Sequence, residues 1–117
     1  MRHTILLLLF LVTIASFTVF IQAQTFKVQK YSIGGEGGTD YLTAEPGTGR
    51  VFVSRESHVM VLDGTKGTIL GDIPETPSTH GIALVASTNH GFTTNRGDST
   101  VTMFDLKTLA VIKKIKV

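Results

Sequence analysis

The stretch "HGIALVASTNHGFTTNRGDSTVTMFDLKTLAVIKKI", residues 80–115, repeats an earlier stretch, "DYLTAEPGTGRVFVSRESHVMVLDGTKGTILGDI", residues 40–73. The aligned pairs are Phe52 with Phe92, Ser54 with Thr94, Val59 with Val101, Val61 with Met103, Asp63 with Asp105, Ile69 with Val111 and Ile73 with Ile115. The offset is 40 residues at first and 42 after two extra residues within "NRGDST". Self-similarity at this period indicates a repeat architecture.

Each copy predicts four short strands. They are 41–45, 50–54, 58–63 and 68–73 in the first copy, and 82–87, 91–94, 100–105 and 110–116 in the second. The segments between them have turn compositions, because Gly and Asn accept positive φ and Asp and Ser bond their own backbone. No amphipathic helix is expected after residue 23. Four strands in about 40–45 residues are typical of a β-propeller blade.

The predicted fold class is therefore all-β: a partial β-propeller of about two four-stranded blades plus one extra strand. Residues 24–38 are an outer strand and link, with "TFKVQKYSI", residues 25–33, as the outermost strand of a preceding blade. Residues 39–78 are the first blade and residues 79–117 the second. Two blades cannot close on themselves and leave outer faces bare. We therefore expect a fragment of a longer propeller; assembly of several copies is the alternative.

The first 23 residues differ from the rest. Arg2 precedes an uncharged apolar run, residues 5–21, and small Ala23 follows. This order is that of a secretory signal peptide, with cleavage after Ala23 and Gln24 as the new N-terminus. The alternative is an uncleaved membrane anchor, although a run of 17 residues is at the short edge of the roughly 17–25 that cross a bilayer. Either reading predicts an exported protein, periplasmic or secreted, and the lack of cysteine favours a bacterial export route.

Composition excludes several kinds of site. The chain has no cysteine, which excludes disulfides, thiolate metal sites and cysteine nucleophiles. The 11 basic residues less Arg2, against 9 acidic ones, leave a formal charge of +1 after residue 23. No basic surface interleaved with aromatic residues is evident, so nucleic acid is not an expected partner.

The repeat resembles the YVTN-type β-propeller family, in which "YVTN" is followed by a turn and "VxVID". "FTTN", residues 92–95, is similar to the first motif and "VTMFD", residues 101–105, to the second. In the first copy "FVSR", residues 52–55, and "VMVLD", residues 59–63, are similar, with Arg55 in place of Asn. "GGEGGTDYLTAEP" and "THGIAL" resemble the inner strands of the YncE-like branch.

The resemblance implies a closed ring, typically of about seven blades, in an exported bacterial protein whose relatives have varied or unknown roles. The function expected is a non-enzymatic module that binds a small molecule or protein at one mouth of the central channel. The alternatives are a propeller-type enzyme (a hydrolase, a lactonase, or a metal- or quinone-dependent oxidoreductase) and a fragment without a function of its own. No cofactor, metal ligand or catalytic residue is assigned, and further blades are the expected partners.

Asp40 and His80 are the main candidate ligand-binding residues. They occupy equivalent positions just ahead of the two innermost predicted strands, and such positions ring one mouth of a propeller channel. A carboxylate can orient and charge an imidazole, which serves binding or acid–base chemistry. Thr39 and Thr79 precede them and add hydroxyls. The alternative role for the pair is structural, bonding the start of each strand or the neighbouring blade.

Other residues are interpreted as structural. Asp63 and Asp105 end the third strand of each copy, where a carboxylate can accept backbone N–H groups of a turn. Asn95, Phe52 and Phe92 are repeat positions.

The remaining motifs are weak. "RGD", residues 96–98, is expected to be a turn rather than an adhesion motif, and "GGEGG", residues 34–38, a flexible link rather than a phosphate loop. His58 and His90 are expected on the surface.

Overall fold

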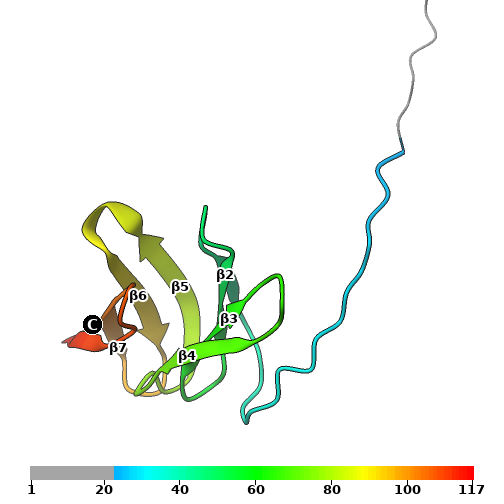
Figure 1. The fold of residues 1–117 in the computed structure, drawn as a ribbon. Helices are drawn as coiled ribbons and strands as arrows, with labels where there is room; N and C mark the ends of the chain where they lie inside the picture. Colours follow the sequence, from blue (N-terminus) through cyan, green and yellow to red (C-terminus); the bar gives the residue numbers. More distant parts are fainter. Residues whose placement is uncertain (1–22) are drawn as a thin grey trace, which may run out of the picture.

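The computed structural model describes residues 23–117, which fold into two antiparallel four-stranded sheets (Figure 1). In each sheet the strands pair in chain order, so that each is a simple meander. The first sheet holds β1 (Leu42–Ala44), β2 (Arg50–Ser54), β3 (Val59–Asp63) and β4 (Ile69–Ile73). The second sheet holds β5 (Thr79–Val85), β6 (His90–Asn95), β7 (Thr100–Asp105) and β8 (Val111–Lys116). The all-β prediction with four strands per copy is confirmed.

The strand bounds differ from the prediction mainly in β5. This strand begins at Thr79 rather than residue 82 and ends at Val85, where Ala86–Thr88 form a 3-10 turn. Asn89 then takes a left-handed conformation with φ 58°, which Asn tolerates better than most residues. The predicted strand over residues 82–87 therefore stops two residues early, because a tight turn must lead into β6.

The two sheets share an irregular strand pairing at equivalent positions of the repeat. The pairing of β3 with β4 shifts between Val61 and Leu62, and the pairing of β7 with β8 shifts between Met103 and Phe104. These are equivalent positions of the two copies. A β-bulge increases local twist, so both sheets twist at the same place and can stack on one another.

One apolar core joins the two sheets. Phe52, Val59, Val61 and Ile73 of the first sheet are fully buried against Ile82, Phe104 and Leu106 from the second. The rings of Phe52 and Phe104 lie at the centre, with centroids 6.0 Å apart. The alternation predicted for β3, with Val59 and Val61 on one face, provides this contact.

The opposite face of the first sheet carries a smaller apolar cluster. Val53, Met60 and Leu62 are buried there, and Ile33 packs against them from the segment before β1. The predicted outer strand over residues 25–33 is not formed: within residues 23–117 no strand lies beside this segment to supply its backbone with partners. Ile33 nevertheless stands 40 residues before Ile73 and covers the first sheet much as Ile73 covers the second.

The second sheet has the matching face uncovered. Phe92, Val101 and Met103 are only partly buried and Ile115 is exposed, although their repeat partners in the first sheet have no solvent exposure. The fold thus leaves an apolar sheet face open where the first sheet has a neighbour. The propeller-like arrangement of blades fits this pattern.

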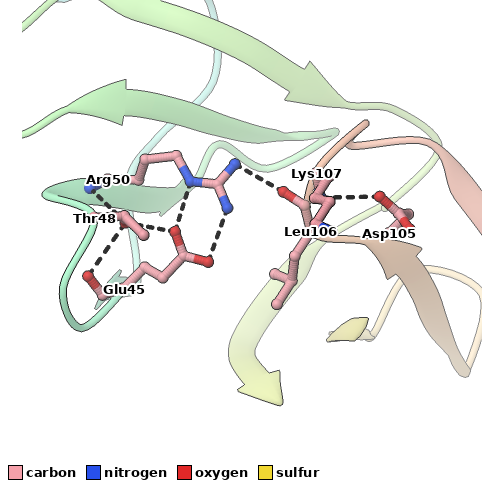
Figure 2. A network of polar contacts seen from close by, with 6 residues as sticks. All are labelled: Glu45, Thr48, Arg50, Asp105, Leu106 and Lys107. Atoms are coloured by element: carbon pink, nitrogen blue, oxygen red, sulfur yellow. Dashed lines mark hydrogen bonds and ion pairs between the residues drawn. The ribbon is translucent and has the colours of Figure 1, made fainter. Parts of the chain in front are cut away.

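A polar network fastens the two sheets at the end where β2 begins (Figure 2). Arg50 donates to both carboxylate oxygens of Glu45, at 2.6 and 2.8 Å, and to the carbonyl oxygen of Leu106 at 2.7 Å. Glu45 also accepts a hydrogen bond of 2.5 Å from Thr48. Every charged group in this network therefore has a partner although Glu45 is buried.

The predicted signal peptide lies outside the described residues apart from Ala23. Within residues 23–117, no helix is long and apolar enough to cross a membrane.

Candidate functional site

Asp40 and His80 meet between the two sheets. Asp40 stands two residues before β1, His80 is the second residue of β5, and the Asp40 carboxylate pairs with Nδ1 of the His80 imidazole. Nearby, Thr43 of β1 donates a 2.9 Å hydrogen bond to the carbonyl oxygen of Ile82 in β5, so the innermost strands of the two sheets lie side by side. Both Asp40 and His80 remain about half exposed, which leaves the pair accessible to a ligand.

Two hydroxyl side chains at equivalent repeat positions hold this region in place. Ser54 Oγ accepts from the backbone N–H of Tyr41 at 2.7 Å and from that of Asp40 at 3.3 Å. In the second copy, Thr94 Oγ1 accepts from the backbone N–H of Gly81 at 3.0 Å. The sequence aligns Ser54 with Thr94 as a repeat pair, but it did not predict that both hydroxyls accept backbone hydrogen bonds here.

His80 occupies a β-bulge rather than a position ahead of the strand. Thr79 pairs with Asn95 and Ile82 with Thr93, so β5 has one residue more than β6 over this interval. A bulge redirects side chains next to it. Thr79 is consequently buried, whereas the next residue, His80, is exposed.

An open cleft of about 290 Å³ lies at this end of the two sheets. All four residues predicted from the sequence, Thr39, Asp40, Thr79 and His80, line it. Glu56, Ser78 and Arg96 line it as well. We call this hollow the inter-sheet cleft.

Backbone hydrogen bonds fix the turns that carry the three unpredicted residues. The N–H of Thr79 donates to the carbonyl oxygen of Glu56 at 3.1 Å, and the N–H of Arg96 donates to that of Ser78 at 3.1 Å. Glu56 and Ser78 also have positive φ values of 61° and 49°. Residues other than glycine adopt such conformations at a cost of about 1–3 kcal/mol, often near functional sites. No local sequence pattern brings these turns together, so sequence reasoning missed them.

The two repeated aspartates serve turns. Asp63 Oδ1 accepts from the backbone N–H groups of Thr65 and Lys66, at 2.8 and 3.0 Å. Asp105 Oδ1 accepts from those of Lys107 and Thr108, both at 2.8 Å. Hydrogen bonds from the turn backbone, chiefly that of Thr65 to Asp63 and that of Thr108 to Asp105, lower the pKa of each carboxyl group. These are the contacts of Asx-turns, away from the inter-sheet cleft.

Asn95 is buried in a polar cluster on the face of the second sheet that meets the first. Its Nδ2 donates to Thr100 and Thr102 at 2.9 and 2.7 Å, and its Oδ1 accepts from Thr93 at 2.9 Å. Phe52 belongs to the core and Phe92 to the open face. All three repeat positions therefore lie outside the candidate site.

The RGD tripeptide is a turn packed on the preceding loop. The N–H of Gly97 donates to the carbonyl oxygen of Pro77 at 3.0 Å. Asp98 Oδ2 pairs with Lys114 Nζ at 2.9 Å, a contact that is the main cause of the lowered pKa of Asp98. Arg96 lines the inter-sheet cleft, so the tripeptide does not present its two charges together at an exposed tip.

The glycine-rich link is bound to a buried arginine. Arg55 donates to the carbonyl oxygens of Gly35 and Glu36 at 3.0 and 3.1 Å. The segment therefore serves as a tether to the first sheet.

His58 and His90 lie apart from the cleft. His58 is 3.5 Å from Asp72, and His90 begins β6. In residues 23–117 no three His, Asp or Glu side chains gather in a way that could hold a metal ion.

Comparison with known proteins is informative about the fold alone. No protein-family model matches the sequence, and no curated protein is significantly similar to it. Among solved structures, the chain is similar to hydrazine synthase of Kuenenia stuttgartiensis, with a TM-score of 0.65 and 18% sequence identity. The match covers 80% of this chain and 27% of that one, so this chain spans about a quarter of the length of that protein. At this identity the likeness concerns the arrangement of the sheets alone.

Proposed function

We propose that residues 39–117 are two blades of a YVTN-type β-propeller and that the chain is a binding module. The ligand, a small molecule or a segment of a protein, occupies the inter-sheet cleft at one mouth of the central channel. Asp40 and His80 are the principal contacts, with Thr39 and Thr79 beside them. Clefts with a few convergent polar groups are the usual place for ligands.

The observation that carries this proposal is the pairing of Asp40 with His80 across the two innermost strands. Asp40 and His80 hold equivalent positions in neighbouring blades, and their contact is open to solvent. Both properties are expected of a ligand site at a channel mouth. The pair also leaves Nε2 of His80 without a hydrogen bond to the described residues, so that a ligand can bind there.

Further blades complete the ring in this proposal. One packs on the open face of the second sheet, over Phe92 and Met103, as the second sheet packs over Phe52 and Val61. Another pairs with residues 25–33, whose apolar side chains Phe26 and Val28 are about 80% exposed. These blades belong to the same longer polypeptide or to other copies of it.

Export through the N-terminal segment is also part of the proposal. N-terminal sequencing of the protein recovered outside the cytoplasm is expected to begin at Gln24. Retention of residues 1–23 in the membrane fraction would favour the uncleaved anchor.

Nuclear magnetic resonance of the isotope-labelled full chain tests the binding function. We would screen small carboxylates, amines, amino acids, sugars and phosphates, and follow the backbone signals of Thr39, Asp40, Thr79 and His80. Saturable shifts confined to these signals, and lost in His80→Ala, are expected for at least one compound. If all compounds leave these signals unmoved, the inter-sheet cleft is not a ligand site.

A further inference from the structure

The inter-sheet cleft contains polar side chains that lack partners. Glu56 and Arg96 line the cleft with exposed side chains that form no ion pair with any described residue, whereas Asp40 and His80 pair together. The hydroxyls of Thr76 and Thr79 are both buried without a hydrogen-bond partner among the described residues. Thr76 lies outside the cleft lining, so the indication of a ligand comes from Glu56 and Arg96.

The other end of the same two sheets is arranged differently. There Glu45, Thr48 and Arg50 satisfy one another and reach the second sheet (Figure 2). At the cleft end Glu56 and Arg96 are open to solvent and form no ion pair among the described residues, although backbone hydrogen bonds fix their turns. This contrast is expected if the groups at the cleft end are kept for a ligand.

The charges of the unpaired groups indicate the kind of ligand. Arg96 offers a cation with several donors, and Glu56 offers an anion that only accepts. A ligand with one charge would leave one of them unpaired, and a polyanion would meet the carboxylates of both Glu56 and Asp40. A small zwitterion complements both, since a guanidinium binds a carboxylate through two parallel hydrogen bonds and a carboxylate binds an ammonium group.

We propose that the inter-sheet cleft binds a free amino acid or a similarly small molecule with one carboxylate and one ammonium group. The ligand carboxylate lies at Arg96 and its ammonium group at Glu56. His80 Nε2 contacts the remainder of the molecule. This inference rests on the proposed function of the cleft, whose volume of about 290 Å³ suits a small molecule.

The test titrates the isotope-labelled full chain with the common L-amino acids, one at a time. Each amino acid that binds is compared with its decarboxylated amine and its deaminated acid. We expect saturable shifts of the Thr79, His80 and Arg96 signals with at least one amino acid, and at least about tenfold weaker binding of its amine and acid. Arg96→Gln and Glu56→Gln should each weaken binding by about tenfold or more. Lys107→Gln, a change on an exposed turn at the other end of the sheets, is the control and should leave affinity unchanged.

The outcome separates this inference from the proposed function. The proposal of a zwitterionic ligand would be overturned if the amine or the acid bound as tightly as the amino acid. It would also be overturned if Arg96→Gln and Glu56→Gln left binding unaffected. Cleft shifts with sugars or phosphates but with no amino acid would also overturn it, and the binding function would stand. The absence of cleft shifts with every compound would contradict both.

Discussion

The rings of Phe52 and Phe104 pack at the centre of the core, 6.0 Å apart and tilted by 33°. They come from different sheets, so this contact joins the two copies of the repeat. Gly91 leaves room for it: a β-carbon on Gly91 would lie 2.1 Å from the Phe104 ring.

Gly91→Ala should therefore destabilise the protein by displacing Phe104. Overpacking of a core costs about 1–3 kcal/mol, and urea unfolding measures the loss. Gly38→Ala is the matched control, because a β-carbon at Gly38 meets nothing within 4 Å. Equal stability of the two variants would show that the ring does not lie against Gly91.

The two copies should respond differently to the same substitution. Phe52→Ala removes a fully buried ring and should cost about 3–5 kcal/mol. Phe92→Ala, at the equivalent position of the open face, should cost at most roughly half as much, since less of its surface leaves water. Urea unfolding of the pair measures the difference. Equal costs would mean that the second sheet is covered as fully as the first.

Arg50→Met should be strongly destabilising. It leaves Glu45 buried and charged without its main partner, and leaving a buried acceptor unsatisfied costs about 1–3 kcal/mol or more for a charged group. The double variant Glu45→Gln/Arg50→Met removes the charge as well and should recover part of the loss. If the double variant is less stable than Arg50→Met in urea, the network of Figure 2 does not explain the effect.

Stability should fall as the pH decreases below about 5. The pKa of Glu45 is lowered, first by its hydrogen bond from Arg50, and that of Asp63 is lowered by turn N–H groups. Asp98 and Asp105 have lowered pKa values too. A carboxyl group with a lowered folded-state pKa favours folding above its unfolded pKa of about 4, and this contribution is lost as the pH falls through the folded value.

Urea unfolding at several pH values measures this dependence. The double variant Asp63→Asn/Asp105→Asn keeps an acceptor oxygen in each turn but cannot titrate. Its stability should decline less steeply with acid than that of the wild type. An identical slope would mean that these two carboxylates do not contribute.

Much of the fold could be predicted from the repeat. Strand bounds 50–54 and 100–105 agree with β2 and β7, because alternating apolar residues between glycine-rich or polar turns define a half-buried strand. Residues 25–33 were expected to form a strand from the same kind of pattern, but a strand needs a neighbour, and the described residues hold none for this segment.

The site was predictable only in part. Thr39, Asp40, Thr79 and His80 were found together because equivalent positions of stacked repeats are neighbours. Glu56, Ser78 and Arg96 lie on turns that meet through backbone hydrogen bonds between distant segments, and such contacts leave no local pattern. The bulge that exposes His80 is likewise a product of pairing between β5 and β6.

Cross-linking across the pair of Asp40 and His80 tests the account most directly. The chain has no cysteine, so the double variant Asp40→Cys/His80→Cys has only the two introduced thiols to join with a short bifunctional thiol reagent. We predict a rapid cross-link within one chain, and none in the control pair Asp40→Cys/Ser87→Cys, whose second site lies beyond the far end of β5. Cross-links only between chains, or equal rates for the two pairs, would contradict the arrangement of the two sheets and with it the inter-sheet cleft.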